Sequence, residues 1–455
     1  MSRKKYEIDM CNGPLLSKIL AYSVPLIASG ILQLLFNAAD MVVAGRFAGS
    51  VALGAVGATS SLINLLINVF IGMSVGSNVL VAHFFGANRA KELGQTVHTS
   101  IALSLISGVV LGIAGFLLAS PLLSLMGTPD DILPHAVIYM QIYFIGVPGM
   151  LLYNFGSAIL RAVGDTKRPL YYLLSAGVIN VILNLFFVVV MQIGVAGVAL
   201  ATIISQFISA ALVIRCLIKE EGDYHLDIRA IRLYPDKVMR ILRVGLPAGF
   251  QGAVFSISNV LIQSSVNSFG SIAVAGNTAA QNLEGFVYNA MNSFHQTALS
   301  FTSQNMGAKK MDRVKKIMWI CVGCVTVTGM VMGFTGLYFA KDLLSIYSTD
   351  SQVIAYGYQR LLIIFASYFL CGVMDVMVGS IRGMGYSIMP MIVSLLGACG
   401  LRVVWIFTVF TFYRTPQVLY ISYPVTWTVT FLVHFVCFTI GYREKSKIGK
   451  KMSES

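Results

Sequence analysis

The five longest stretches of the chain without a charged residue are each long enough to cross a lipid bilayer. They are residues 47–88, 93–129, 132–160, 169–214 and 244–283. A membrane-spanning helix needs about 20 predominantly apolar residues. Charged residues make up only 11% of the 455 residues, whereas about 25% is usual in soluble domains. These features exclude a soluble enzyme and predict an all-helical protein that crosses the membrane many times.

The positions of the basic residues indicate how the chain is oriented in the membrane. Lysine and arginine concentrate at Arg3, Lys4 and Lys5 and in residues 86–94, 161–168, 215–243 and 306–316. Cytoplasmic loops carry the excess of positive charge in membrane proteins. We therefore expect twelve spans in a plasma or inner membrane, with both termini cytoplasmic. The net charge of +13 then reflects membrane orientation, and no nucleic-acid partner is expected.

An internal repeat with an offset of about 221 residues divides the sequence into two similar halves. The segment FFGANRAKE at 84–92 matches NMGAKKMDR at 305–313, and ILRAVGDTKRP at 159–169 matches SIRGMGYSIMP at 380–390. Chance recurrence of glycine and proline is the alternative, but several anchors share one offset. Because both halves have six spans and begin on the same side, we expect parallel repeats related by a pseudo-two-fold axis, as in secondary transporters.

The repeat predicts three parts of the chain. They are an N-terminal lobe at 1–218, a cytoplasmic linker at 219–237 and a C-terminal lobe with a basic cytoplasmic tail at 238–455. Pro25 and Pro247 lie early in the first helix of each lobe. A missing backbone donor permits a helix to bend at such positions.

The two matched loops, the two matched turns and the segment NAADMVVAGRFAGSVALGAVG at 37–57 together resemble the multidrug and toxic compound extrusion (MATE) transporters. Residues around Asp40 look most like the bacterial DNA-damage-inducible branch of that family. The resemblance covers residues from about 15 to 440. It implies two six-helix lobes around a central cavity, and export of organic compounds against an inward flow of protons or sodium ions.

Asp40 is the clearest candidate for ion coupling. Gln33, Asn37 and Asp40 are spaced four and three apart, so they share one face of an otherwise apolar helix. An ionisable residue in a span costs about 2.5–3.5 kcal/mol on insertion scales and needs an explanation. A carboxyl group on a wet face can take up a proton outside and release it inside. The alternative is a buried aspartate held by neighbouring amides.

Three further polar residues complete the predicted cation site. Asn180 and Asn184 share a helix face at i and i+4, and Thr202 follows in the next span. The cation site that the resemblance implies includes this set. The position of Asn184 is often an aspartate in that branch, and the missing negative ligand favours proton over sodium coupling. Hydrogen bonds that merely hold helices together are the alternative.

Polar stripes along several spans are predicted to line a substrate cavity. The candidate residues are Gln33, Asn37, Asn64, Asn68, Gln206, Gln263, Gln281, Glu284, Tyr288 and Asn292. Such stripes cannot all face lipid. Glu284 is expected to attract a cationic substrate or to form a structural pair, and both readings stay open. His295, on the same stripe, is expected to be a hydrogen-bonded core residue.

The second lobe contains two more charges whose positions follow from the repeat. Asp375 aligns with Asn154 and Arg402 with Asn180, and we expect the two charges to form a salt bridge, with a structural and a transport role equally open. Arg360 lies toward the end of its span and is expected to snorkel to the surface. Asp40 aligns near Ile262, so the lobes are expected to differ chemically.

These features predict a cation-coupled antiporter, driven by protons rather than sodium, that exports amphipathic, cationic organic compounds by alternating access. One alternative is a flippase for lipid-linked saccharides, and another is an integral membrane transferase enzyme. No cofactor or metal is expected beyond the transported ion, and Cys321 and Cys324 are expected to pack between helices. The expected partners are small organic substrates and the bilayer, and the expected functional unit is a monomer.

Overall fold

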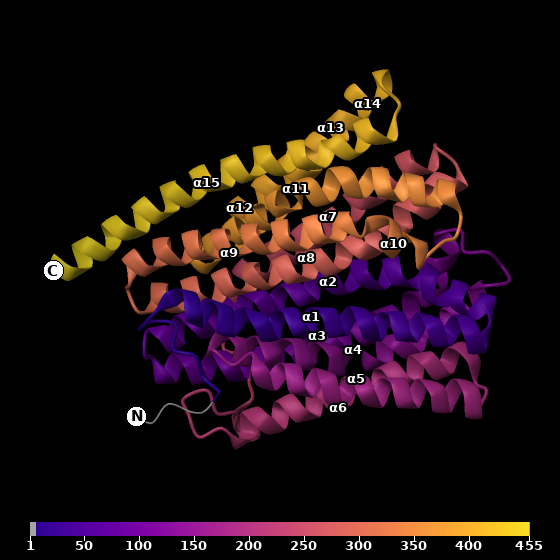
Figure 1. The fold of residues 1–455 in the computed structure, drawn as a ribbon. Coiled ribbons are helices and arrows are strands. Elements are labelled where there is room, and N and C mark those ends of the chain that lie inside the picture. The colour runs from indigo at the N-terminus through magenta and orange to yellow at the C-terminus, as the bar shows by residue number, and fades with distance from the viewer. Residues whose placement is uncertain (1–5, 455) are drawn as a thin grey trace. The chain divides into compact units, whose positions relative to one another are not determined.

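The computed structural model describes residues 6–454, with side chains up to residue 447, and these residues form helices and connecting turns without any strand. Figure 1 shows the helices in chain order. The N-terminal basic residues Arg3, Lys4 and Lys5 lie outside the described residues.

Six long helices make up the first half of the chain. They are α1 (Leu15–Val43), α2 (Ser50–Gly86), α3 (Ala90–Leu125), α4 (Leu133–Ala162), α5 (Lys167–Leu185) and α6 (Gly194–Lys219). Two π-helical turns extend α1 and α5, η1 (Ala44–Ala48) and η2 (Phe186–Val190). A short 3-10 turn, η3 (Ile228–Ala230), lies in the linker that follows.

The second half repeats this pattern with one interrupted span. Its helices are α7 (Pro235–Asn267), α8 (Ser271–Gly307), α9 (Met311–Tyr338), α10 (Ala340–Ser345), α11 (Ser351–Gly383), α12 (Ile388–Ser394), η4 (Leu395–Gly400), α13 (Leu401–Phe407), α14 (Val409–Phe412) and α15 (Pro416–Glu454). The run from α12 to α14 reads as a single span, Ile388–Phe412. The π-helical turn η4 therefore lies inside this span, whereas η2 ends the corresponding span of the first half.

Matched turns in the two halves use glycine where the backbone requires it. Gly49 precedes α2 with φ 94°, and Gly270 precedes α8 with φ 91°. Gly164 and Gly385, in the matched turns after α4 and α11, have φ 101° and 93°. A side chain at such φ values is strained. The glycines of the sequence repeat thus mark turns of the same geometry.

Among the described residues, 11 helices are long and apolar enough to cross a membrane. The remaining long helix, α8, has 37 residues and carries the polar stripe that contains Glu284, which lowers its hydropathy. The all-helical fold of twelve membrane helices in two repeated halves is therefore confirmed.

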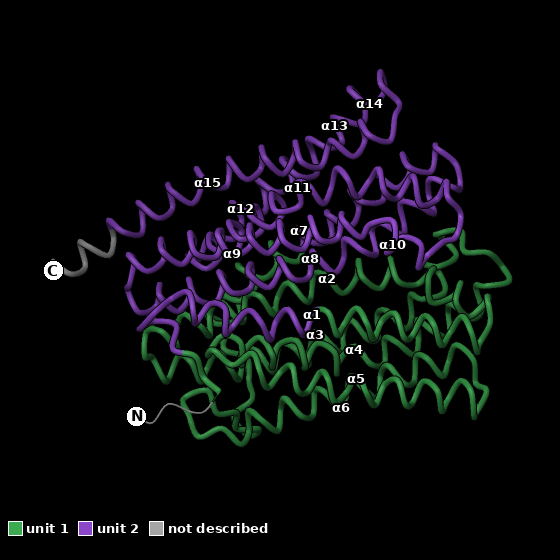
Figure 2. The backbone as a smooth tube through the Cα atoms, in the orientation of Figure 1, with its two compact units in different colours: residues 1–8, 31–249 green, residues 9–30, 250–455 purple. Residues whose placement is uncertain are grey.

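Contacts divide the chain into two compact units, which Figure 2 shows in different colours. Unit 1 comprises residues 1–8 and 31–249, and unit 2 comprises residues 9–30 and 250–455. The first part of α1 therefore belongs to unit 2, and the first part of α7 belongs to unit 1. These boundaries fall inside two helices, close to Pro25 and Pro247, whereas the lobes expected from the sequence begin and end in loops.

Polar contacts fix the first part of α1 within unit 2. The Tyr22 hydroxyl donates to Ser300 Oγ at 2.9 Å, and Ser23 Oγ lies 2.8 Å from Thr297 Oγ1. All four residues are buried. Buried hydroxyl pairs of this kind satisfy groups that would otherwise be costly inside a membrane protein.

A close crossing fixes the first part of α7 within unit 1. An added Cβ atom at Gly76 of α2 would lie 2.2 Å from the backbone oxygen of Ile241, and one at Gly245 would lie 2.5 Å from Met73 Cα. Membrane helices approach this closely only where small residues face each other. The glycines of α2 and α7 therefore set the distance between the two backbones.

Replacing Gly76 by alanine is expected to destabilise the protein by about 1–3 kcal/mol, because the new methyl group forces apart two backbones that cannot yield. Gly57→Ala on the same helix is the matched control, since nothing lies within 4 Å of its added Cβ. The thermal unfolding midpoint of the purified protein in detergent measures both. Equal midpoints for the two variants would show that the α2–α7 crossing does not limit stability.

Candidate functional site

Asp40 lies at the centre of a polar cluster in unit 1. Asn184 Nδ2 donates a hydrogen bond to Asp40 Oδ1, and Thr202 Oγ1 donates to Asp40 Oδ2 at 3.4 Å. The same Asn184 amide also donates to Asn180 Oδ1 at 3.2 Å. Asn180 is 4% exposed and Asn184 is fully buried. The structure thus brings together the four residues of the predicted cation site.

Helix packing explains how the sequence builds this cluster. An added Cβ atom at Gly177 of α5 would lie 1.9 Å from the Phe36 ring of α1. The missing side chain therefore lets α5 approach α1 closely. Asp40 lies one turn after Phe36, and Asn180 follows Gly177 at nearly the same spacing, so the close approach places their side chains opposite each other.

Two unsatisfied acceptors border the cluster. Asn184 Oδ1 and Gln206 Oε1 are buried and have no hydrogen-bond partner among the described residues. Buried polar groups are normally hydrogen-bonded, so an exception calls for an explanation. Together with the Asp40 carboxylate they offer only oxygen acceptors, the groups that bind a hard cation or a hydrated proton. The donor set therefore suits a small cation.

Two tyrosines of α4 belong to the surroundings of Asp40, although the sequence analysis did not identify them. Tyr139 and Tyr143 lie close enough to interact electrostatically with Asp40, and Tyr143 also lies beside Gln206. Their ring centroids are 6.2 Å apart. In the sequence, their i, i+4 spacing on an apolar helix is the feature that could have identified them. They add hydroxyl groups without adding charge.

The predicted cavity residues differ in how far they are exposed. Exposed positions are Gln33, Asn37, Asn64, Gln281 and Tyr288, and half-buried positions are Asn68, Gln206, Gln263 and Asn292. Only Glu284 is buried, at 7% exposure. The assignment of these residues to a substrate cavity stays a prediction.

Glu284 and Arg360 form a buried ion pair in unit 2. Arg360 Nε donates to Glu284 Oε1 at 2.6 Å and Nη2 donates to Oε2 at 2.8 Å. Arg360 Nη1 also donates to Asn277 Oδ1 at 2.9 Å. Arg360 is 2% exposed, so the expectation that it snorkels is wrong. The reason is that α11 packs against both α8 and α15 in the interior of unit 2, which leaves this side chain no path to the surface.

A polar chain extends from this ion pair along α8 and α7. Asn277 Nδ2 donates to Gln263 Oε1 at 3.1 Å, and Gln263 Nε2 donates to Asn267 Oδ1 at 3.0 Å. Of the two predicted roles of Glu284, attraction of a cationic substrate or a structural pair, the observed contacts fit the structural pair. The structure therefore does not show Glu284 as a free carboxylate that could attract a cationic substrate.

The expected salt bridge between Asp375 and Arg402 does not form: within the described part of the chain the two side chains are not within ion-pair distance. Asp375 is instead hydrogen-bonded by the Tyr288 hydroxyl, and its backbone oxygen lies 2.6 Å from His295 Nδ1. Arg402 lies over the Tyr423 ring at 4.1 Å. The two residues thus face different helices, Asp375 facing α8 and Arg402 facing α15. His295 is hydrogen-bonded, as predicted.

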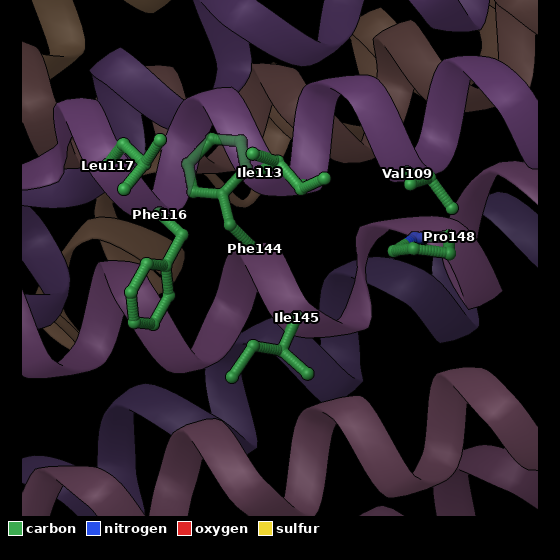
Figure 3. A pocket seen from close by; sticks show the side chains of 8 residues that line it. Val109, Ile113, Phe116, Leu117, Phe144, Ile145 and Pro148 are labelled. Atoms are coloured by element: carbon green, nitrogen blue, oxygen red, sulfur yellow. The ribbon is translucent and has the colours of Figure 1, made fainter.

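An apolar groove of about 270 Å³ lies between α3 and α4 (Figure 3). Its lining residues are Val109, Gly112, Ile113, Phe116, Leu117, Phe144, Ile145 and Pro148. The groove offers no polar group that could bind a cation or orient a polar substrate, so it is not a candidate transport site. Across the described residues, no group of three or more His, Cys, Asp or Glu side chains is placed to hold a metal ion.

The repeated six-helix halves and their buried polar clusters define a membrane transporter. The MatE family model matches residues 25–186 and 247–408, one copy in each half. The chain therefore belongs to the MatE family, and the repeat and the resemblance predicted from the sequence are confirmed. The finer assignment to the DNA-damage-inducible branch stays a prediction.

Individual relatives extend over nearly the whole chain. The probable multidrug resistance protein YoeA of Bacillus subtilis is 28% identical over 434 residues, which cover 93% of each chain. A FAD transporter of Shewanella oneidensis is 25% identical over 79% of this chain and 82% of its own. The outward-facing structure of a multidrug resistance MATE family transporter matches with a TM-score of 0.91 at 20% identity, covering 98% of this chain and all of its own. This last likeness concerns the fold.

Proposed function

We propose that the protein is a cation-coupled antiporter of the cell membrane that exports amphipathic, cationic organic compounds, with protons rather than sodium ions as the coupling ion. One observation carries the proposal. Asp40 is held only by neutral donors, Asn184 and Thr202, and none of the described lysines or arginines forms an ion pair with it. An aspartate without a permanent counter-ion can exchange one cation for another, whereas a salt-bridged aspartate cannot.

Proton coupling follows from the neutral groups around Asp40. A sodium site is strengthened by additional negative ligands. As ligands for a cation, Asn180 and Asn184 offer only neutral amide oxygens, and a single carboxylate is present. Binding of one proton neutralises this carboxylate completely. Antiport then results when protonation and substrate binding favour opposite orientations of the transporter.

The relatives carry names as different as multidrug resistance protein and FAD transporter, so the substrate class rests on the chemistry of the site. The substrate and the proton are expected to compete for binding near the single carboxylate of Asp40. A positively charged substrate binds there more favourably than a neutral one. The aromatic side chains of Tyr139 and Tyr143 near Asp40 provide surface for an amphipathic body. A monomer with both termini cytoplasmic is part of the proposal.

Transport by proteoliposomes tests this function. The full chain is reconstituted in phosphatidylcholine vesicles, and uptake of rhodamine B ethyl ester, a permanently cationic dye, is followed by fluorescence. An interior that is more acidic than the medium is expected to drive dye inward, while a sodium gradient at equal pH is not. Uptake driven only by sodium would contradict proton coupling, and no response to either gradient would contradict antiport. Flipping of a lipid-linked saccharide without dye transport would favour the flippase alternative.

A further inference from the structure

Arg402 is a buried cation in unit 2 without a carboxylate partner. It is 3% exposed and lies in α13, directly after the π-helical turn η4. Its Nη2 donates to Thr426 Oγ1 at 3.3 Å, and its guanidinium lies over the Tyr423 ring at 4.1 Å. Its Nε has no hydrogen-bond partner among the described residues. A guanidinium has five donors, so most of its bonding capacity is unused.

The charges around Arg402 do not balance. Arg360 approaches the same Tyr423 ring at 5.2 Å, but its charge is matched by the bidentate contact with Glu284. Within the described residues no acidic side chain plays this part for Arg402. An unmatched charge inside a membrane protein is costly and commonly marks a functional site. A negative group from outside the chain would remove the imbalance.

The repeat relates this position to the cation site of unit 1. Arg402 corresponds to Asn180, and the position of Asp40 corresponds to Ile262, which is apolar and 2% exposed. Both spans contain a π-helical turn, but at different places: η2 ends its span after Asn180, whereas η4 lies directly before α13, which contains Arg402. Such turns are frequent at functional sites. Each half therefore holds one of these charges at a position whose counterpart in the other half is neutral, a carboxylate in unit 1 and a guanidinium in unit 2.

We propose that Arg402, with Thr426 and Tyr423, is a subsite for an anionic oxygen group, a carboxylate or phosphate, on a transported amphipathic compound. Guanidinium groups bind such oxyanions with two parallel hydrogen bonds. The subsite lies beside aromatic side chains that suit an apolar body: Tyr423 and Trp427 have ring centroids 5.5 Å apart, and Trp427 stacks on Tyr368 at 5.5 Å. The proposal rests on the proposed function and extends its substrates from cations to zwitterions.

Binding of two matched dyes tests the subsite. Rhodamine B carries a free carboxylate, whereas in its ethyl ester this group is esterified and carries no negative charge. Fluorescence anisotropy of each dye is measured with the purified full chain in uncharged detergent.

Arg402→Gln is expected to weaken rhodamine B binding about tenfold, the equivalent of one lost charged hydrogen bond. Binding of the ester is expected to stay within about twofold of the unmodified protein. Arg402→Lys, which keeps the charge, is expected to restore part of the affinity. Arg414→Gln, at an exposed position, is the matched control and is expected to change neither dye.

Each other outcome overturns the proposal. Equal loss for both dyes would show that Arg402 supports the fold, and no loss for either dye would show that the subsite does not exist. The dye measurements are repeated in nanodiscs of phosphatidylcholine with and without phosphatidylglycerol. Carboxylate selectivity that disappears on adding phosphatidylglycerol would assign Arg402 to a lipid headgroup instead. Because binding at equilibrium needs no gradient, these results are independent of whether Asp40 couples transport to protons.

Discussion

Asp40→Asn is expected to reduce gradient-driven dye uptake to the level of protein-free vesicles while leaving equilibrium dye binding measurable. The asparagine keeps the shape of the side chain and can still contact Asn184 and Thr202, so the fold is preserved. It cannot take up or release a proton at any physiological pH, so the coupled step is lost. Proteoliposome uptake and anisotropy of rhodamine B ethyl ester measure the two properties separately.

Two variants of the side chains that contact Asp40 complement this prediction. Thr202→Val removes a long hydrogen bond of 3.4 Å to Asp40 and is expected to retain most of the transport activity, because such a bond contributes little. Asn184→Asp adds a second carboxylate beside Asp40 and is expected to make transport responsive to a sodium gradient. If Asp40→Asn still transports dye in response to a pH gradient, another residue carries the proton and the coupling proposal fails.

Arg360→Met is expected to destabilise the protein by about 3–5 kcal/mol, because it leaves Glu284 as an uncompensated charge in a buried site. The methionine fills much of the space of the arginine side chain, so the loss reports the charge rather than a cavity. Thermal unfolding of the purified chain in detergent measures the effect. If the ion pair has only a structural role, transport is expected to fall only in proportion to the folded fraction.

The double variant separates the ion pair from other causes of instability. Glu284→Gln combined with Arg360→Met removes both charges and is expected to recover more than half of the loss, as a coupled pair requires. An additive double variant would mean that the two residues do not stabilise each other. Full stability of Arg360→Met alone would mean that the pairing with Arg360 does not stabilise the fold, and Glu284 would again be a candidate transport residue.

The sequence was sufficient for the helices, the repeat and the Asp40 cluster. Long apolar stretches leave few choices other than membrane helices, and residues three and four apart must share a helix face. Asn180, Asn184 and Asp40 could therefore be grouped before their contacts were known, with help from the family resemblance. The roles of these residues were not settled by the same means and stay proposals.

Contacts between distant helices were harder to predict. The pairing of Glu284 with Arg360 depends on the register between α8 and α11, which spacing along one helix does not reveal. The predicted pairing of Arg402 with Asp375 failed for the same reason, since alignment of the repeat gives equivalent positions but not side-chain directions. Tyr139 and Tyr143 were missed because tyrosines in an apolar helix look like ordinary packing residues.

Because α1 and α7 each contribute residues to both compact units, the chain cannot be separated into two complete halves at the linker. A fragment that ends in the connection after α6 would lack the part of α7 that completes unit 1, and its complement would lack residues 9–30, which complete unit 2. Neither piece would carry a full set of packing partners. Separate production of the halves would therefore yield incomplete products, and joint production of both in one cell would reassemble them by exchange of their opening segments, as in split-protein complementation.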